Sequence, residues 1–174
     1  IVDLELKVLK TIIPMRHKGV RVDLDKAEVI KKDLHAREKK LLDAVTKLTG
    51  IAVEIWAAES VAKAFDALGL TYPKTEKINA PSFTKGFLAK MIVQAREFNK
   101  ARTTFVDTIL KHQTNGRIHA ELHPLRSDQG GTVTGRFSYS NPNLQQIPAR
   151  HGEIGPMIRS LFLPEENCLW GAFD

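Results

Sequence analysis

Residues 132–150 read "TVTGRFSYSNPNLQQIPAR" and carry the most specific pattern in the chain. An arginine lies near each end, and between them are serine, asparagine and glutamine side chains with few apolar neighbours. Amide side chains both donate and accept hydrogen bonds, so they suit base edges and sugars. Gly130, Gly131 and Gly135 allow the backbone to approach a ligand closely. The stretch therefore predicts a loop that faces a polar, extended ligand, and an irregular surface loop is the alternative.

The composition is that of a folded chain with an excess of positive charge. The 174 residues are 43% hydrophobic and 26% charged, and 26 Lys and Arg against 20 Asp and Glu give a net charge of +6. This excess favours an anionic partner such as nucleic acid. Cys168 is the single cysteine, which excludes an internal disulfide, fits a reducing compartment and predicts a small buried hydrophobe. No apolar run is long enough to cross a bilayer, so we expect a soluble chain without a membrane partner.

The first two thirds of the chain have the apolar spacing of helices. A first helix is expected from about Leu4 to Gly19, and Asp23 is the predicted N-cap of a long second helix that Gly50 ends. Two further helical patterns cover residues 58–68 and 84–112, and the second pattern would also fit two shorter helices. The residues between these patterns are typical of a loop.

Strand patterns appear only near the end of the chain. Apolar and polar residues alternate over 118–123 after an Asn-Gly turn, which predicts one strand. Residues 156–174 read as two apolar strands joined by "PEEN" in a hairpin. Helices followed by strands predict an α+β fold.

Three groups of side chains were considered for chemistry. His119 and His123 share one face of the predicted strand, but without a third ligand a solvated polar face is favoured over a metal site. Arg96 and Lys100 lie one helical turn apart and suit neighbouring phosphates, with a solvated basic face as the alternative. Asp174 ends a predicted strand, where a carboxylate can bind a metal, although a lone Asp is more often a turn former or surface charge.

Taken together, the motifs resemble the DNA polymerase I (A) family of DNA-dependent DNA polymerases. The resemblance lies in the order Thr-Gly-Arg, two serines, Pro-Asn-Leu-Gln and Ile-Pro-x-Arg, followed by "IRSLF" and a segment ending in Asp. It extends over "MRHKGVRVDL", "TEKINAPS", "AREFNKARTTFVDTIL" and "NGRIHAEL", which resemble the entry into the thumb, the thumb loop, the helix back to the palm and the first palm strand. The chain departs from the family at "AVEIWAAESVAKAF", where Trp56 and its neighbours replace a helix cap.

The resemblance implies a helical thumb subdomain followed by the first antiparallel strands of a polymerase palm. The implied divisions are a palm entry helix at 1–21, the thumb at 22–113 and the N-terminal palm at 114–174. It implies that Arg136 reaches the minor groove at the primer terminus and that Arg150 lies near the incoming nucleotide as part of the catalytic site. Asp174 would be the first catalytic carboxylate and a ligand to two Mg²⁺ ions. The implied DNA-binding residues are Thr134, Arg136, Ser138, Asn143, Gln145, Gln146, Arg96 and Lys100.

The function that follows from the resemblance is part of a template-dependent DNA polymerase for replication or repair. Its partners would be primer–template DNA, deoxynucleoside triphosphates in the complete enzyme, and a complementary polymerase chain if the enzyme is split. We expect the chain alone to be inactive, because the fingers and the remaining palm would follow residue 174. A bacterial or phage-infected cytoplasm is the expected location, with an organelle left open. The alternatives are a noncatalytic duplex-binding module and a helical scaffold that binds only protein.

Overall fold

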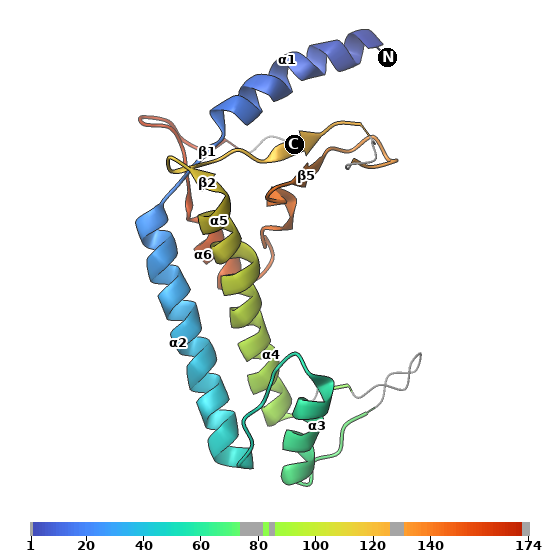
Figure 1. The fold of residues 1–174 in the computed structure, drawn as a ribbon, viewed down its shortest axis with the longest axis vertical. Helices are drawn as coiled ribbons and strands as arrows, with labels where there is room; N and C mark the ends of the chain where they lie inside the picture. The colour runs from blue at the N-terminus through green and yellow to red at the C-terminus, as the bar shows by residue number, and fades with distance from the viewer. Residues whose placement is uncertain (1, 74–81, 84–85, 126–130, 172–174) are drawn as a thin grey trace. The chain divides into compact units, whose positions relative to one another are not determined.

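The computed structural model describes residues 2–73, 82–83, 86–125 and 131–171 (Figure 1). It is an α+β chain, as predicted, with long helices and short antiparallel strands. The chain divides into two compact units. The helical unit is formed by residues 31–103, and the terminal unit by residues 1–30 and 104–174.

The helical unit is built from the greater part of α2 (Leu24–Thr49), from α3 (Ala58–Ala67) and from α4 (Phe87–Lys100). An aromatic group anchors its core, since the ring centroid of Phe65 lies 5.8 Å from that of Tyr72 and 4.9 Å from that of Phe83. Such edge and tilted ring contacts stabilise a core beyond the area they bury. Other buried side chains of this unit belong to the same core cluster, namely Val45, Ile55, Val61, Ala64, Leu88, Ala89, Met91, Ile92 and Ala95.

Both predicted ends of the long second helix are confirmed. The Asp23 carboxylate accepts the backbone N–H of Lys26 at 2.9 Å, which caps the start of α2. Gly50 follows the end of this helix with a φ of 71°, a conformation that glycine adopts without the steric cost other residues have. The helical pattern predicted for 84–112 is α4, a π-helical segment η1 (Ala101–Val106) and α5 (Asp107–His112).

The terminal unit contains two small antiparallel sheets. The larger has the strand order β2-β3-β1-β6, and the smaller pairs β4 with β5. Helix α1 (Val2–Lys18) precedes β1, and the short helices of this unit include α5, η2 (Leu144–Gln146) and α6 (Ile154–Arg159). The strands are β1 (Val20–Val22), β2 (Gln113–Thr114), β3 (Arg117–Ile118), β4 (Glu121–His123), β5 (Ser138–Ser140) and β6 (Phe162–Leu163).

Gly19 joins α1 to the central strand of the larger sheet. Its φ is 65°, and a Cβ atom at this position would lie 2.6 Å from the carbonyl oxygen of Ile118. That distance is far below van der Waals contact, so only glycine lets the end of α1 approach β3.

Two strand predictions were wrong. The single strand predicted over 118–123 is divided between two sheets, because β3 pairs with β1 and β2 whereas β4 pairs with β5. The hairpin predicted over 156–174 is also wrong in its first part, which belongs to α6. Ile154, Ile158 and Leu161 are buried at helical spacing, and that spacing was the missed signal.

The second half of the predicted hairpin is not a strand in its described part. After β6 the chain turns at 166–167, and residues 168–171 pair with no strand. Cys168 is exposed, against the prediction of a buried hydrophobe, because this segment has no paired partner to cover it. Among the described helices, none is both long and apolar enough to cross a membrane.

Candidate nucleic-acid interface

The first half of the polar stretch folds into a turn that exposes Arg136. The hydroxyl of Thr132 donates to the carbonyl oxygen of Arg136 at 2.7 Å, and Gly135 has a φ of 72°. The backbone N–H of Gly131 donates to the hydroxyl of Ser138 at 3.1 Å, where β5 begins. The Arg136 side chain is exposed and makes no hydrogen bond or ion pair within the described part of the chain. The turn therefore presents a guanidinium with all of its donors available.

The amide side chains in the second half are used unequally. Asn143 caps η2, because its Oδ1 accepts the backbone N–H of Gln145 at 3.1 Å. The side-chain amide of Gln145 donates to the carbonyl oxygen of Phe137 at 2.9 Å and thereby ties the two halves of the stretch together. Gln146 is exposed, and no contact of its side chain is found among the described residues. Asn143 and Gln145 thus have an internal structural use, while Arg136 and Gln146 face solvent.

A carboxylate on β4 anchors the end of β5. The Oε2 atom of Glu121 accepts hydrogen bonds from the hydroxyl of Ser140 at 2.9 Å and from the amide of Asn141 at 3.0 Å. The guanidinium of Arg16 lies 3.6 Å from the other oxygen. These partners favour the charged carboxylate, and the hydrogen bond from Ser140 is the largest cause that lowers the pKa of Glu121 below its ordinary value. Glu121 therefore holds the end of the strand that lies within the polar stretch.

The two histidines considered as metal ligands have other partners. His123 Nε2 lies 2.7 Å from the hydroxyl of Ser140, and His119 Nδ1 lies 3.0 Å from the carbonyl oxygen of Arg16. The described residues contain no group of three metal-binding side chains. Asp174, the predicted metal ligand, lies outside the described residues, and Arg150 is exposed.

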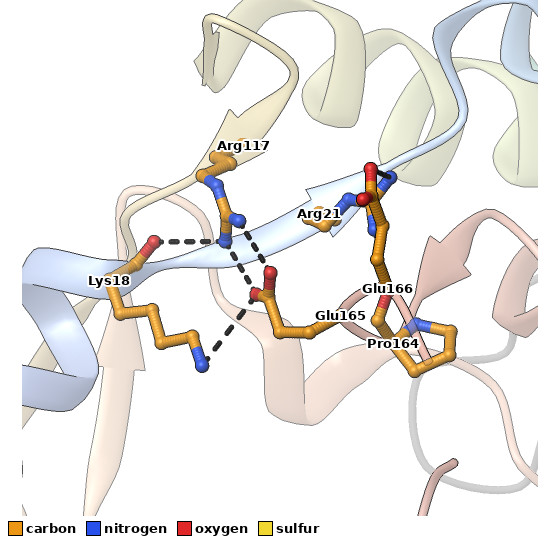
Figure 2. A network of polar contacts seen from close by, with 6 residues as sticks. All are labelled: Lys18, Arg21, Arg117, Pro164, Glu165 and Glu166. Atoms are coloured by element: carbon orange, nitrogen blue, oxygen red, sulfur yellow. Dashed lines mark hydrogen bonds and ion pairs between the residues drawn. The ribbon is translucent and has the colours of Figure 1, made fainter. Parts of the chain in front are cut away.

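A second charged network holds the segment that leads toward Asp174 (Figure 2). Figure 2 shows the Glu165 carboxylate between Arg117 and Lys18. Arg117 donates two hydrogen bonds of 2.8 Å to the two oxygens of Glu165, and the hydrogen bonds from Arg117 are the main cause that lowers the pKa of Glu165. Arg21 donates to the carbonyl oxygen of Pro164 at 3.1 Å. Bidentate pairs of this kind fix geometry, so β1 and β3 hold the turn after β6.

The two cations predicted to bind phosphate differ in their surroundings. Arg96 on α4 is half-buried, and its Nε–H donates to the carbonyl oxygen of Ile55 at 2.6 Å. Lys100, one turn further along, is exposed. Both belong to the helical unit, whereas the polar stretch belongs to the terminal unit.

The DNA polymerase family A model matches residues 25–174 of the chain. The chain belongs to this family. It is 35% identical over 189 residues to a DNA-directed DNA polymerase of Pseudomonas phage M6, covering 99% of this chain and 28% of that protein. It is 32% identical over 185 residues to the thermostable DNA polymerase I of Thermus filiformis, covering 99% of this chain and 22% of that protein.

A solved structure of the family has a similar fold. The POL domain of Pol1 from M. smegmatis, in complex with DNA primer-template and dNTP, matches with a TM-score of 0.74 and 26% identity. The match covers 91% of the present chain and 29% of the chain from M. smegmatis. The present chain therefore spans less than a third of the length of each of these relatives.

The sequence indicated the residue types of the candidate interface, but it did not indicate the side chains that hold the surrounding backbone in place. Glu121, Arg117 and Glu165 carry no motif that distinguishes them from other surface charges, and the last two are separated by 48 positions. The bonds of Asn143 and Gln145 inside the stretch were also missed. The N-cap role of Asn143 was the one accessible signal, since Asn directly before a short helical turn is a common cap.

Proposed function

We propose that this chain is the part of a template-dependent DNA polymerase that grips the primer–template duplex, in replication or repair. In this proposal residues 22–113 are the thumb, residues 114–174 are the N-terminal palm, and residues 1–21 are the helix entering the thumb. The single observation that carries the proposal is the turn at Gly135, which exposes the side chain of Arg136 without a hydrogen bond or ion pair to the described residues. Family membership supplies the class of ligand.

The chemistry of Arg136 suits the minor groove of a duplex. Acceptors on A·T and T·A pairs occupy equivalent places in that groove, so a donor can contact them without reading the sequence. A polymerase must bind every sequence it has copied, which is the requirement such a contact meets. Gln146 is the amide of the stretch best placed to assist, because its side chain is exposed and Asn143 and Gln145 are engaged within the loop. Thr134 and Ser138 complete the proposed contact surface.

The proposed chemical step depends on Asp174, at the end of the segment that Glu165 and Arg117 hold. Carboxylate oxygen is the ligand type that Mg²⁺ prefers, so Asp174 fits the metal-binding role expected in the complete enzyme. Two bound Mg²⁺ ions would supply the charge that stabilises the attacking and leaving oxygens. Arg150 is proposed to act near the incoming deoxynucleoside triphosphate.

The chain alone is proposed to be inactive, because its relatives are more than three times as long. We further propose a bacterial or phage-infected cytoplasm as its location, since the relatives named above come from a phage and from bacteria. Arg96 and Lys100 would add contacts to backbone phosphates from the helical unit.

A titration of the 174-residue chain with labelled primer–template DNA tests duplex binding. We expect saturable binding that weakens as salt increases, with a slope of about −0.9 in log affinity against log salt for each phosphate neutralised. Binding that does not depend on salt, or the absence of any binding, would contradict the proposal and favour a protein-binding scaffold.

A second experiment separates the polymerase from a noncatalytic duplex-binding module. In the polymerase polypeptide that contains this chain, Asp174→Asn should abolish primer extension and leave duplex affinity within about twofold, because only the metal ligand is changed. The matched control is Glu166→Gln, an exposed carboxylate 4.0 Å from Arg21, which should extend primers normally. Primer extension that survives Asp174→Asn would contradict the catalytic role.

A further inference from the structure

Arg96 has an arrangement that a solvated basic face does not explain. Its Nε–H donates to the carbonyl oxygen of Ile55 at 2.6 Å, and its guanidinium carbon lies 5.7 Å from the ring centroid of Trp56. Ile55 and Trp56 belong to the connection between α2 and α3, which runs beside α4 (Figure 1). No partner of the two Nη groups occurs among the described residues. One edge of the guanidinium is thus fixed, and the opposite edge keeps its donors.

Trp56 is itself held in place although it is 59% exposed. Its indole N–H donates to Oδ1 of Asn99 at 3.1 Å, and the amide of Asn99 donates to Oε1 of Glu38 at 2.7 Å. Glu38 is only 7% exposed, and its second oxygen accepts a hydrogen bond from Arg102 at 3.2 Å. A chain of hydrogen bonds therefore connects the exposed indole to a buried carboxylate. A large aromatic side chain with this support is ordered without being buried.

We propose that Trp56, together with the carbonyl of Ile55, positions Arg96 to bind a backbone phosphate of the primer–template duplex. The proposal rests on the duplex-binding function proposed above and adds a positioning residue to it. An arginine that uses Nε internally can offer its two Nη groups as a pair to phosphate oxygens. Trp56 lies in the segment where this chain departs from the family pattern, so the family resemblance does not supply this role.

Holding Arg96 in advance lowers the entropy cost of binding phosphate and fixes the direction of its donors. A free arginine side chain loses rotamer freedom when it binds phosphate, whereas Arg96 has lost most of that freedom in the folded chain. The face of the indole attracts the guanidinium and limits its rotation. Lys100, an exposed ammonium on a flexible stem, has no such support and contacts phosphate as a point charge.

The test measures duplex affinity, its salt slope and the melting temperature for variants of the 174-residue chain. Arg96→Ala should reduce the magnitude of the salt slope by about 0.9, as for one lost phosphate contact. Trp56→Ala should weaken binding about three- to tenfold at fixed salt, in the range of one ordered cationic contact. The double variant should bind no more weakly than Arg96→Ala, because Trp56 acts through Arg96. Phe87→Ala is the matched control, since Phe87 is an aromatic side chain of the same unit that is 71% exposed, and its affinity should be unchanged.

Two further variants test the positioning role even if Trp56→Ala does not fold. Trp56→Phe keeps a ring over the guanidinium and loses the N–H that binds Asn99, so its affinity should fall between those of wild type and Arg96→Ala. Arg96→Lys keeps the charge and loses the Nε–H and the paired Nη donors, so it should bind more weakly than wild type.

The outcomes distinguish this inference from the function on which it rests. Equal affinity of Trp56→Phe and wild type, full additivity of Trp56→Ala with Arg96→Ala, or wild-type binding by Arg96→Lys would overturn the positioning role. If Arg96→Ala has no effect while Arg136→Ala weakens binding, the positioning role is overturned and duplex binding stands. If the wild-type chain binds no duplex, the proposed function fails as well.

Discussion

Arg96 in the helical unit and Arg136 in the terminal unit are both proposed to bind DNA, but the protein holds them in opposite ways. The side chain of Arg96 is held directly, through Nε by Ile55 and across its face by Trp56. The side chain of Arg136 makes no hydrogen bond or ion pair in the part of the chain that the structure describes, and its backbone carbonyl is held instead, by the hydroxyl of Thr132. One arginine is ordered before its ligand arrives, and the other can adjust to it.

The difference matches the ligands proposed for the two residues. A phosphate has a fixed shape at every nucleotide, so an ordered guanidinium gains affinity without losing generality. The minor-groove edge offers acceptors at equivalent places, but a G·C pair adds a donor there, so a contact that must accept every pair benefits from a side chain that can shift. Both arginines carry the same charged group, so they differ in how that group is supported and in whether its Nε–H is already engaged within the protein.

The largest expected effect is that of Arg136→Ala. Loss of this contact should weaken duplex binding by about 1–3 kcal/mol, roughly five- to 150-fold, with the melting temperature unchanged because the exposed side chain makes no hydrogen bond or ion pair with the described residues. Fluorescence anisotropy with labelled primer–template DNA measures the affinity. Lys10→Ala, which removes an exposed cation from α1, is the control. A loss no larger than that of the control would refute the groove contact.

Asn143→Ala tests whether the backbone of the polar stretch needs its internal support. Removing the cap of η2 should cost about 1 kcal/mol of unfolding free energy, measured by urea denaturation, and should weaken duplex binding indirectly. Asn143→Asp keeps the acceptor and should recover stability, while its negative charge should leave duplex binding weak. Gln146→Ala is the matched control for stability and should unfold as wild type does. Unchanged stability of Asn143→Ala would show that the cap does not support the stretch.

Lys100→Ala should have a smaller effect that appears mainly in the salt dependence. One phosphate contact fewer reduces the magnitude of the slope of log affinity against log salt by about 0.9. Trp56→Ala combined with Lys100→Ala should be additive, because the structure gives no contact between those side chains in its described part. Lys63→Ala on α3 is the control, since that lysine is paired with Glu59 at 3.1 Å. An unchanged slope would place Lys100 outside the interface.

The smallest effect is expected from acid. Hydrogen bonds from Ser140 and Asn141 lower the pKa of Glu121 below the ordinary value of 4.5, so the folded chain favours the carboxylate. Its stabilisation is present above that ordinary value and is lost as the pH falls through the lower pKa of the folded state. Melting temperatures between about pH 3 and pH 6 should therefore fall less steeply for Glu121→Gln than for wild type. Equal acid sensitivity of the two proteins would contradict the role of Glu121. The pKa of Glu165 is also lowered, so the variant Glu165→Gln measures how much of the acid sensitivity comes from that residue.

Helix boundaries could be predicted because their causes are local. Asp23 and Gly50 act on residues within one turn, so the sequence contains the whole interaction. Strands could not be predicted equally well, because a strand forms only where a partner pairs with it. The residues after Ile118 alternate as one strand would, yet β3 and β4 find partners in different sheets. Residues 156–159 were predicted as part of a strand from their apolar content, whereas the helical spacing of Ile154, Ile158 and Leu161 places them in α6.

For the candidate interface, the amino-acid sequence was sufficient to indicate the family and the polar stretch and to predict an anionic partner, since these depend on residue types and their order. It could not indicate which amide side chains of the stretch are engaged within the loop, because Asn143 and Gln145 are chemically as suited to DNA as Gln146. Tertiary structure made that choice, through hydrogen bonds within the loop, and it likewise brought Trp56 to Arg96 and Arg117 to Glu165. The physical reason is that a polar group can satisfy its hydrogen bonds in several ways, and the folded backbone determines which partner lies within reach.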